Sequence, residues 1–345
     1  MLKLPAPHVK LSAGKQRGLD AISTDRGIIA ALAIDQRSAL RKLFADSSGV
    51  AADDISTDLL VEFKSHVSRI LTAHASAILL DPEYGLPAAV LRHKNAGLLF
   101  SYERTGYDKS IPGRLPSLLE RFSVARLRET GADAIKVLLY YSPFSAAGIN
   151  MQKYAWVERV GAECLGMDIP FFLELVSYHD DVDEKGSDFA RIKPDIVIRS
   201  VEEFCKPRYG VDVLKVGAPV NMNFVESPAL PRSQALYTRV EAAAHFRRAS
   251  DAASVPFIYL SESVSNEMFA YALALAAESG SAFSGVLCGR AIWRDGVSVF
   301  VRNGGPALDD WLNDQGVKNI QNVNVCLAAA HPWHERLTAV SRKEG

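Results

Sequence analysis

Three charged residues interrupt apolar runs of this 345-residue chain, and their types could carry out chemistry. Lys136, Glu174 and Lys215 each lie between two aliphatic neighbours. Burying a charged side chain is costly unless a partner of opposite charge accompanies it. The three are therefore either a structural ion triad or groups of an active site. Lys215 could also stand where a strand ends, with its amine in water.

The set suits carbon–carbon bond chemistry through an imine. A desolvated lysine amine can condense with a ketone. Lys136, as a second cation beside Lys215, would favour the neutral amine that attacks. Glu174 could transfer the protons that imine formation requires. The three residues thus predict class I aldol cleavage, which needs no cofactor and no metal. The eight histidines are scattered without ligand spacing.

Eight short apolar runs must position these residues. They are continuous rather than alternating, as expected for strands buried on both faces of a parallel sheet. They cover residues 27–34, 77–80, 97–100, 134–140, 170–176, 211–216, 255–260 and 284–289. Segments with helical spacing lie between them at residues 57–74, 118–130, 154–165, 233–252 and 265–279. The alternation predicts an α/β fold of the (β/α)8 TIM-barrel class.

A doubly wound sheet is the alternative architecture. It is less favoured because Asp35-Gln36-Arg37, and not a glycine-rich phosphate loop, follows the first run. We expect a single TIM-barrel domain over residues 1–345, with a core at about 27–300 and extensions at both ends.

Polar residues stand inside or just after each of the eight runs. They are Asp35, Asp81, Glu103, Lys136, Glu174, Lys215, Ser261 and Arg290. Because the carboxyl ends of barrel strands meet on one face, the set predicts an active site there. Long loops expected at residues 142–150 and 219–231 would line the same face.

The last two runs suggest a phosphate site. Ser261 follows the seventh run, and Gly289 and Arg290 follow the eighth. Barrels commonly bind phosphate at this place with backbone amides. An arginine there adds a charge-assisted hydrogen bond. A loop glycine beside a surface arginine is the alternative interpretation.

The composition of the chain limits the kinds of molecule that the protein is expected to bind. The net charge is -1, so no electrostatic case exists for a nucleic acid or an acidic membrane surface. No apolar stretch has the length of a membrane span or of a signal-peptide core. The four cysteines form no CxxC pair. We therefore expect a cytoplasmic protein that acts on a small molecule, without nucleic-acid or membrane partners.

Six stretches, taken together and in order, resemble class I tagatose 1,6-bisphosphate aldolases. They are residues 30–37 (AALAIDQR), 80–85 (LDPEYG), 131–141 (GADAIKVLLYY), 172–174 (FLE), 212–216 (DVLKV) and 285–291 (GVLCGRA). Each stretch alone is weakly specific, whereas their combination at matching spacing is specific.

This resemblance implies a TIM barrel that cleaves a ketose 1,6-bisphosphate to dihydroxyacetone phosphate and glyceraldehyde 3-phosphate. It implies that Lys215 forms the Schiff base and that Glu174 is the acid/base group. The other implied site residues are Asp35 and Lys136 beside the reacting carbons, Gln36 in contact with the substrate, and Ser261, Gly289 and Arg290 at the C1 phosphate. The expected partner is a small-molecule sugar phosphate, and a homo-oligomer is a generic expectation for such barrels.

The chain departs from the family pattern after the seventh run. Small residues or glycine usually follow the serine there, whereas Glu262 and Ser263 follow Ser261 in this chain. A carboxylate would repel a phosphate unless its side chain turns away. Two other functions therefore stay open: an aldolase for another ketose 1-phosphate, such as a sulfonated or deoxy sugar, and a phosphosugar-binding barrel without catalysis.

Overall fold

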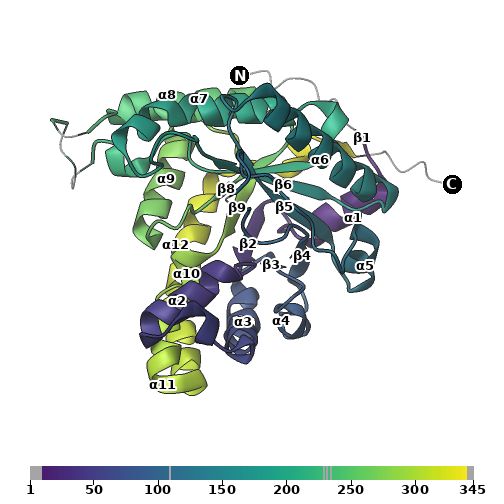
Figure 1. Cartoon of the computed structure of the whole chain (residues 1–345), viewed down its shortest axis with the longest axis vertical. Coiled ribbons are helices and arrows are strands. Elements are labelled where there is room, and N and C mark those ends of the chain that lie inside the picture. The colour runs from purple at the N-terminus through teal and green to yellow at the C-terminus, as the bar shows by residue number, and fades with distance from the viewer. Residues whose placement is uncertain (1–9, 109, 228–229, 231, 234, 340–345) are drawn as a thin grey trace.

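The chain folds as a closed barrel of eight parallel strands, β2 to β9, in which the last strand pairs with the first. The computed structural model describes residues 10–339 except 109, 228, 229, 231 and 234. Helices surround the strands (Figure 1). The predicted (β/α)8 barrel is confirmed, and its closure excludes the doubly wound alternative. The outermost parts of the two expected extensions lie outside the described residues.

Each predicted run coincides with one strand to within two residues at either end. The strands are β2 (Ile29–Ala33), β3 (Ala77–Leu80), β4 (Gly97–Ser101), β5 (Ala134–Tyr141), β6 (Phe171–Ser177), β7 (Val213–Val216), β8 (Phe257–Leu260) and β9 (Gly285–Cys288). Nearly all of their residues are buried, because helices cover the outer face and side chains fill the interior.

The barrel interior is apolar towards the amino ends of the strands and charged towards their carboxyl ends. Residues two apart in a strand share a face. In β5, Ala134 belongs to the apolar interior and Lys136 follows on the same face. The same order recurs in the next two strands, with Phe172 then Glu174, and Val213 then Lys215. The charged residues therefore rest on an apolar floor.

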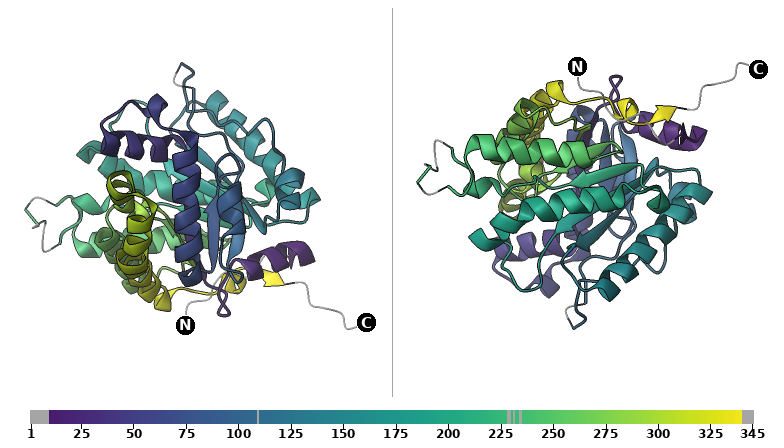
Figure 2. Two further views of the ribbon diagram at one scale, coloured as in Figure 1. Left: turned by 90° about the horizontal axis from the view of Figure 1, so that it is seen from below. Right: turned by 90° about the horizontal axis from the view of Figure 1, so that it is seen from above.

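Helices form the outer ring (Figure 2). They are α2 (Ser38–Ser48), α3 (Thr57–Leu71), α4 (Leu86–Val90), α5 (Val124–Glu129), α6 (Ala147–Gly166), α7 (Ser187–Phe204), α8 (Arg239–Ala252), α9 (Asn266–Glu278), α10 (Arg290–Trp293), α11 (Gly296–Trp311) and α12 (Val317–Cys326). None of the helices in the described residues combines the length and the apolar character that a membrane crossing requires.

Capping explains where two of the predicted helices begin. α8 begins later than predicted, at Arg239, because Thr238 and Glu241 form a capping box. α5 also begins later than predicted, at Val124, because the Ser123 side chain accepts a hydrogen bond from the first turn.

α6 is longer than predicted and shortens the loop expected at residues 142–150. It begins at Ala147. Gly148 and Asn150 have low helix propensity, so the sequence pattern indicates a loop here. In the fold, the Asn150 amide donates a hydrogen bond to the Ser142 carbonyl at 3.0 Å and ties the loop to the helix.

α7 is a helix that the sequence pattern does not predict. Pro194 stands inside it, and proline usually interrupts a helix. Phe189, Ile196 and Val201 on this helix are buried, so packing of its apolar face outweighs the interruption. α7 also carries Lys193, which reaches the carboxyl end of the barrel.

The first and last described segments close the amino end of the barrel. α1 (Ala13–Ala21) packs on the loops that lead into β5 and β6. Lys15 in this helix donates a hydrogen bond to Asp212, at the start of β7, at 2.7 Å. Beside it, β1 (Lys10–Leu11) pairs in parallel with β10 (Thr338–Ala339).

Candidate active site

Three adjacent strands bring the predicted reactive residues together. Lys136 comes from β5, Glu174 from β6 and Lys215 from β7. Glu174 and Lys215 are register partners, so their side chains leave the sheet side by side. All three residues are at most 6% exposed. Since charged groups this deeply buried need partners, their contacts define the site.

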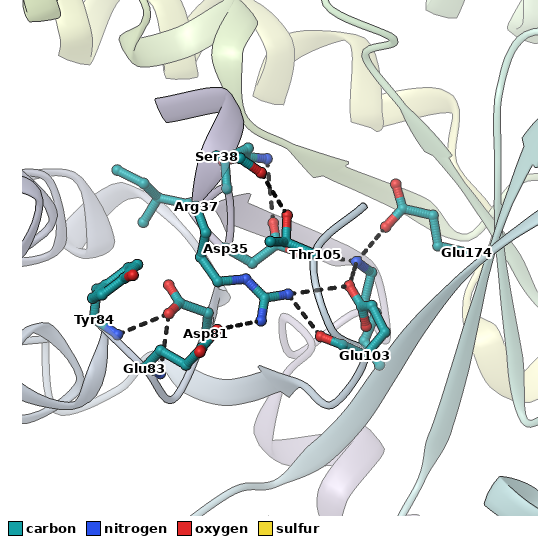
Figure 3. Close-up of polar contacts among 12 residues, drawn as sticks. Asp35, Arg37, Ser38, Asp81, Glu83, Tyr84, Glu103, Thr105 and Glu174 are labelled. Atoms are coloured by element: carbon teal, nitrogen blue, oxygen red, sulfur yellow. Dashed lines mark hydrogen bonds and ion pairs between the residues drawn. The ribbon is translucent and has the colours of Figure 1, made fainter. Parts of the chain in front are cut away.

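One carboxylate oxygen lies between the two lysines. Glu174 Oε2 is 2.7 Å from Lys136 Nζ and 3.0 Å from Lys215 Nζ. Lys136 Nζ also lies 2.9 Å from Asp35 Oδ2 and 2.8 Å from Glu103 Oε1. Figure 3 shows Asp35, Glu103 and Glu174 converging from different strand ends. The amines of two lysines and the carboxyl groups of three acidic residues thus form one buried cluster.

Burial and charge together set the protonation of this cluster. Burial raises the pKa of Glu174, but Lys136 and Lys215 outweigh it and hold that pKa below its ordinary value. The same balance holds the pKa of Asp35 well below its ordinary value. For Glu103 burial prevails and the pKa is raised. Burial lowers the pKa of Lys136, but the three carboxylates raise it well above its ordinary value. Glu174 and Asp35 are therefore carboxylates at neutral pH, and Lys136 is an ammonium.

The two lysines differ in how many partners they have. Lys136 contacts Asp35, Glu103 and Glu174, whereas among the described residues Lys215 forms an ion pair with Glu174 alone. Lys136 is the second cation that the sequence led us to expect beside Lys215. Lys136 therefore holds three carboxylates in place, whereas Lys215 is an amine with a single ion-pair partner.

Two cavities meet above the cluster. One of about 620 Å³ extends towards the ends of β7 and β8, and one of about 250 Å³ towards the end of β2. Leu138, Tyr140, Glu174 and Arg290 line both. Glu174 therefore separates the buried Lys215 from a space large enough for a small ligand.

Two of the three residues predicted at a phosphate line the same space, and Gly289 does not. Ser261 lines the larger cavity, and Arg290 lines both. Gly289 lies so close to β2 that an added Cβ would be 2.8 Å from the Ala33 carbonyl oxygen. Burial lowers the pKa of Arg290, and Asp35 only partly opposes this. Among the described residues Arg290 forms no ion pair, so it presents a half-buried guanidinium to an incoming anion.

Gln36 lies between the cluster and the smaller cavity. Its amide nitrogen donates a hydrogen bond to Asp35 Oδ1 at 3.2 Å. Its amide oxygen is buried and has no hydrogen-bond partner within the described structure. Because a buried acceptor without a partner is costly, this oxygen is suited to accept a hydrogen bond from a bound hydroxyl group.

Glu103 and Arg37 belong to the cluster; Glu103 was among the residues predicted at the active face, but neither was assigned a catalytic or binding role. Glu103 was recognisable as a charge just after β4. Arg37 donates to the Glu103 carbonyl oxygen and to Glu83 Oε2, each at 2.7 Å (Figure 3). Its position directly after Asp35 and Gln36 is the sequence signal that could have identified Arg37. Arg37 holds in place the loop that carries Asp35 and Gln36.

Asp81 stands at a strand end but does not join the site. It pairs with Lys64 of α3, and both side chains are fully buried. Lys64 also donates hydrogen bonds to the carbonyl oxygens of Ile34 at 2.6 Å and Gln36 at 3.0 Å. The Lys64–Asp81 pair thus connects α3 to the ends of β2 and β3.

Glu262 lines the larger cavity together with Ser261 and Arg290, and its charge is paired there. Its carboxylate contacts Lys193 Nζ at 2.9 Å. The expected repulsion is thus met by a counter-ion that the sequence pattern did not reveal.

Known proteins resemble the whole chain. A tagatose 1,6-diphosphate aldolase 2 from Enterococcus faecalis is 52% identical over 95% of this chain and 98% of its own length. A tagatose 1,6-diphosphate aldolase from Listeria monocytogenes is 49% identical over 94% of this chain and 95% of its own length. A fructose-bisphosphate aldolase from Plasmodium falciparum has a similar fold, with a TM-score of 0.66 at 13% identity, covering 94% of this chain and 98% of that chain.

The family assignment follows from these relatives together with a sequence profile. The profile of DeoC/LacD family aldolases matches residues 29–295, which include all eight barrel strands. The chain therefore belongs to the DeoC/LacD family of aldolases.

Proposed function

We propose that this aldolase cleaves a ketose 1,6-bisphosphate, such as tagatose 1,6-bisphosphate, through an imine at Lys215. The products are dihydroxyacetone phosphate and glyceraldehyde 3-phosphate. The observation that carries the proposal is the Glu174 oxygen between the Lys215 and Lys136 side-chain nitrogens. The names of the relatives at 49% and 52% identity support the choice of substrate.

Imine formation begins with proton transfer between neighbours. Glu174 Oε2, 3.0 Å from the amine, accepts a proton from Lys215. The freed amine attacks the ketose C2 carbonyl, and Glu174 returns a proton to the departing water. The resulting iminium joins Lys215 to C2. Lys136 stays charged and keeps Glu174 in place throughout.

Bond cleavage then uses the iminium as an electron sink. A carboxylate removes the C4 hydroxyl proton, the C3–C4 bond breaks, and its electron pair moves into the iminium to give an enamine. Glyceraldehyde 3-phosphate leaves as the aldehyde. Protonation of C3 and hydrolysis release dihydroxyacetone phosphate and restore the Lys215 amine. Asp35, held ionised beside Lys136, is placed to orient a sugar hydroxyl together with Gln36.

The C1 phosphate is proposed to bind at Ser261, Gly289 and Arg290. The half-buried guanidinium of Arg290 supplies the charge. An added Cβ at Gly289 would meet the Ala33 carbonyl oxygen, so glycine allows the end of β9 to pack closely against β2. This end of the substrate lies above β8 and β9, and the reacting carbons lie over β6 and β7.

Reductive trapping tests the proposal. Sodium borohydride with dihydroxyacetone phosphate should reduce the imine and add the ligand's mass to the peptide that contains Lys215. Omission of the ligand and the Lys215→Met variant are the controls. A wild-type enzyme that carries no adduct at Lys215 would contradict the proposed mechanism.

A substrate panel separates the proposal from its competitors. Tagatose and fructose 1,6-bisphosphates should be turned over with the highest kcat/KM. Faster cleavage of a sulfonated or deoxy ketose 1-phosphate would assign another substrate. Tight binding of these sugars without turnover would assign a phosphosugar-binding protein.

The assembly and the location of the protein also belong to this proposal. We propose a cytoplasmic homo-oligomer, supported by the generic preference of such barrels for symmetric assemblies. Light scattering coupled to size exclusion tests the assembly, and cell fractionation tests the location. A monomer, or recovery outside the cytoplasm, would contradict these two expectations.

A further inference from the structure

The turn that follows β8 has an unusual backbone for its sequence. Ser261 to Val264 form a four-residue turn closed by a hydrogen bond from Val264 N–H to the Ser261 carbonyl at 3.0 Å. Its two central residues, Glu262 and Ser263, have φ angles of 45° and 67°. Positive φ at both central positions is typical of a type I′ turn, which favours glycine, asparagine and aspartate. Strained backbone of this kind persists only where the surroundings enforce it.

The Glu262 carboxylate supplies that enforcement by joining three elements. Both of its oxygens lie 2.9 Å from Lys193 Nζ on α7. Oε2 also accepts a hydrogen bond from the Ala218 N–H at 3.1 Å, just past the end of β7. Gly217 makes room for this contact, because an added Cβ would be 2.3 Å from Oε1. The carboxylate thus fastens the turn after β8 to the end of the strand that carries Lys215.

A second contact holds the same turn from the other side. Arg294 Nη1 donates a hydrogen bond to the Ser263 carbonyl oxygen at 3.4 Å. Lys193, Glu262 and Ser263 all line the larger cavity, together with Arg290. The turn is therefore both a wall of the cavity and a point at which α7, β7 and β8 meet.

We propose that Lys193 and Glu262 form a charge-compensated clamp that makes this turn able to accept a phosphate. Lys193 cancels a carboxylate that would otherwise repel the dianion, and the pair holds the amides of the turn in place. Both are positioning residues, since neither is placed at the reacting carbons. The inference rests on the proposed function in one respect, namely that a phosphate group of the substrate binds beside Ser261.

The burial of the two partners supports this role for Lys193. Its side chain is 8% exposed, whereas that of Glu262 is 32% exposed and faces the cavity. Removing either charge therefore leaves the other at the cavity wall. A loss of Lys193 leaves a negative charge there, and a loss of the Glu262 charge leaves a positive one. A pair that served only the stability of the fold would not produce opposite effects on anion binding.

Charge-removing variants test the clamp. We would measure the Kd of inorganic phosphate by isothermal titration calorimetry and the KM and kcat for fructose 1,6-bisphosphate. Lys193→Met should raise the phosphate Kd and the KM by about tenfold. Glu262→Gln keeps a hydrogen-bond acceptor for Ala218 and should bind phosphate as tightly as the wild type or tighter. The double variant should recover most of the affinity that Lys193→Met loses.

The controls separate charge from folding. Lys318→Met removes an exposed ion-paired lysine on α12 and should leave all three quantities unchanged. Lys193→Arg keeps the charge and should stay close to the wild type. If Lys193→Met does not fold, Glu262→Gln and the double variant still carry the test. Melting temperatures of every variant are recorded alongside.

Two results would overturn the inference. One is a Lys193→Met enzyme that binds phosphate as tightly as the wild type. The other is a Glu262→Gln enzyme that binds phosphate several-fold more weakly than the wild type. Neither depends on catalysis, because the calorimetry measures phosphate directly. Failure of borohydride trapping at Lys215 would instead contradict the proposed function.

Discussion

The two ends of β7 each carry a buried ion pair between a lysine and a carboxylate. The two pairs differ in their number of partners and in the space beside them. At the amino end Asp212 pairs with Lys15 at 2.7 Å, and at the carboxyl end Lys215 pairs with Glu174 at 3.0 Å. Both pairs are nearly inaccessible to water. Burial of charge alone therefore does not identify a catalytic group.

What separates the pairs is the number of partners and the neighbouring space. Asp212 has one cation and one backbone donor, the Phe171 N–H at 2.8 Å, and no cavity reaches it among those described. Glu174 has two cations on one oxygen and lines two cavities. A satisfied, enclosed pair holds the fold together, whereas a shared carboxylate beside open space can exchange a proton with a ligand. This agrees with the general division of barrels into a stabilising and a catalytic face.

The largest expected effect is at the carboxyl end of the strand. Lys215→Met should lower kcat/KM by about ten-thousand-fold, because it removes the attacking amine. Its Tm should stay within about 3 °C of the wild type. Steady-state kinetics and thermal unfolding measure the two quantities. A large loss of Tm with a modest loss of activity would contradict this prediction. It would show that the pair at the carboxyl end of β7, like that at the amino end, serves mainly the stability of the fold.

Glu174→Gln should produce the next largest effect. We expect kcat to fall by about a thousand-fold, since the amide cannot transfer the protons of imine formation. Glu103→Gln is the matched control, because Glu103 contacts Lys136 but has no ion pair with Lys215. Glu103→Gln should lower kcat by about tenfold or less. Equal losses for the two variants would show that Glu174 acts only by holding Lys136.

Lys15→Met should affect stability and leave catalysis intact. It leaves the Asp212 carboxylate buried without a counter-ion, so the free energy of unfolding at pH 7 should fall by about 3 kcal/mol. Burial already raises the pKa of Asp212, and Lys15 opposes this, so the pKa rises further in the variant. A group with a raised folded pKa loses its stabilising contribution as pH rises through that value.

The loss in Lys15→Met should therefore be smaller at pH 5 than at pH 8. Urea denaturation at both pH values measures it, and kcat of the folded fraction serves as the control. A destabilisation that does not change with pH would argue against an ionised, unpaired Asp212 in the variant.

Asp35→Asn should show the opposite pH dependence with the smallest effect. The pKa of Asp35 is held well below its ordinary value by Lys136 and Lys215 against burial. Its stabilising contribution is therefore present above the unfolded pKa of about 4 and lost as pH falls below it. We expect a loss of about 1 kcal/mol at pH 7 that is smaller at pH 3, because the contribution fades as pH falls towards the lowered folded pKa. Denaturation at the two pH values checks this, and a constant loss would contradict it.

The strands and the central residues could be predicted because their signals are local. A charge inside an aliphatic run is visible in a few residues, as at Lys136 and Lys215, and its burial follows from the strand around it. Continuous apolar runs likewise located all eight strands. Helix ends depended on single caps such as Thr238, and α7 was missed because Pro194 locally argues against it.

The partners of charged residues could not be predicted, since they come from distant parts of the chain. Asp35 and Asp81 both follow a strand, yet Lys64 of α3 takes Asp81 away from the site. Glu262 was expected to conflict with a phosphate, and its counter-ion Lys193 lies on the helix that was not predicted. Sequence patterns predicted which charged residues are buried, whereas their partners are known only from the folded structure.

The pairing of β1 with β10 has a consequence for the order in which the molecule can assemble. Lys10–Leu11 leave the ribosome early, and Thr338–Ala339 leave it last of the described residues. The amino-end closure by α1 can therefore be completed only after nearly the whole barrel has been synthesised. Until then the apolar underside beneath Trp333 and Leu19 is incompletely covered. This face of a growing chain therefore stays open to a chaperone until synthesis is nearly complete.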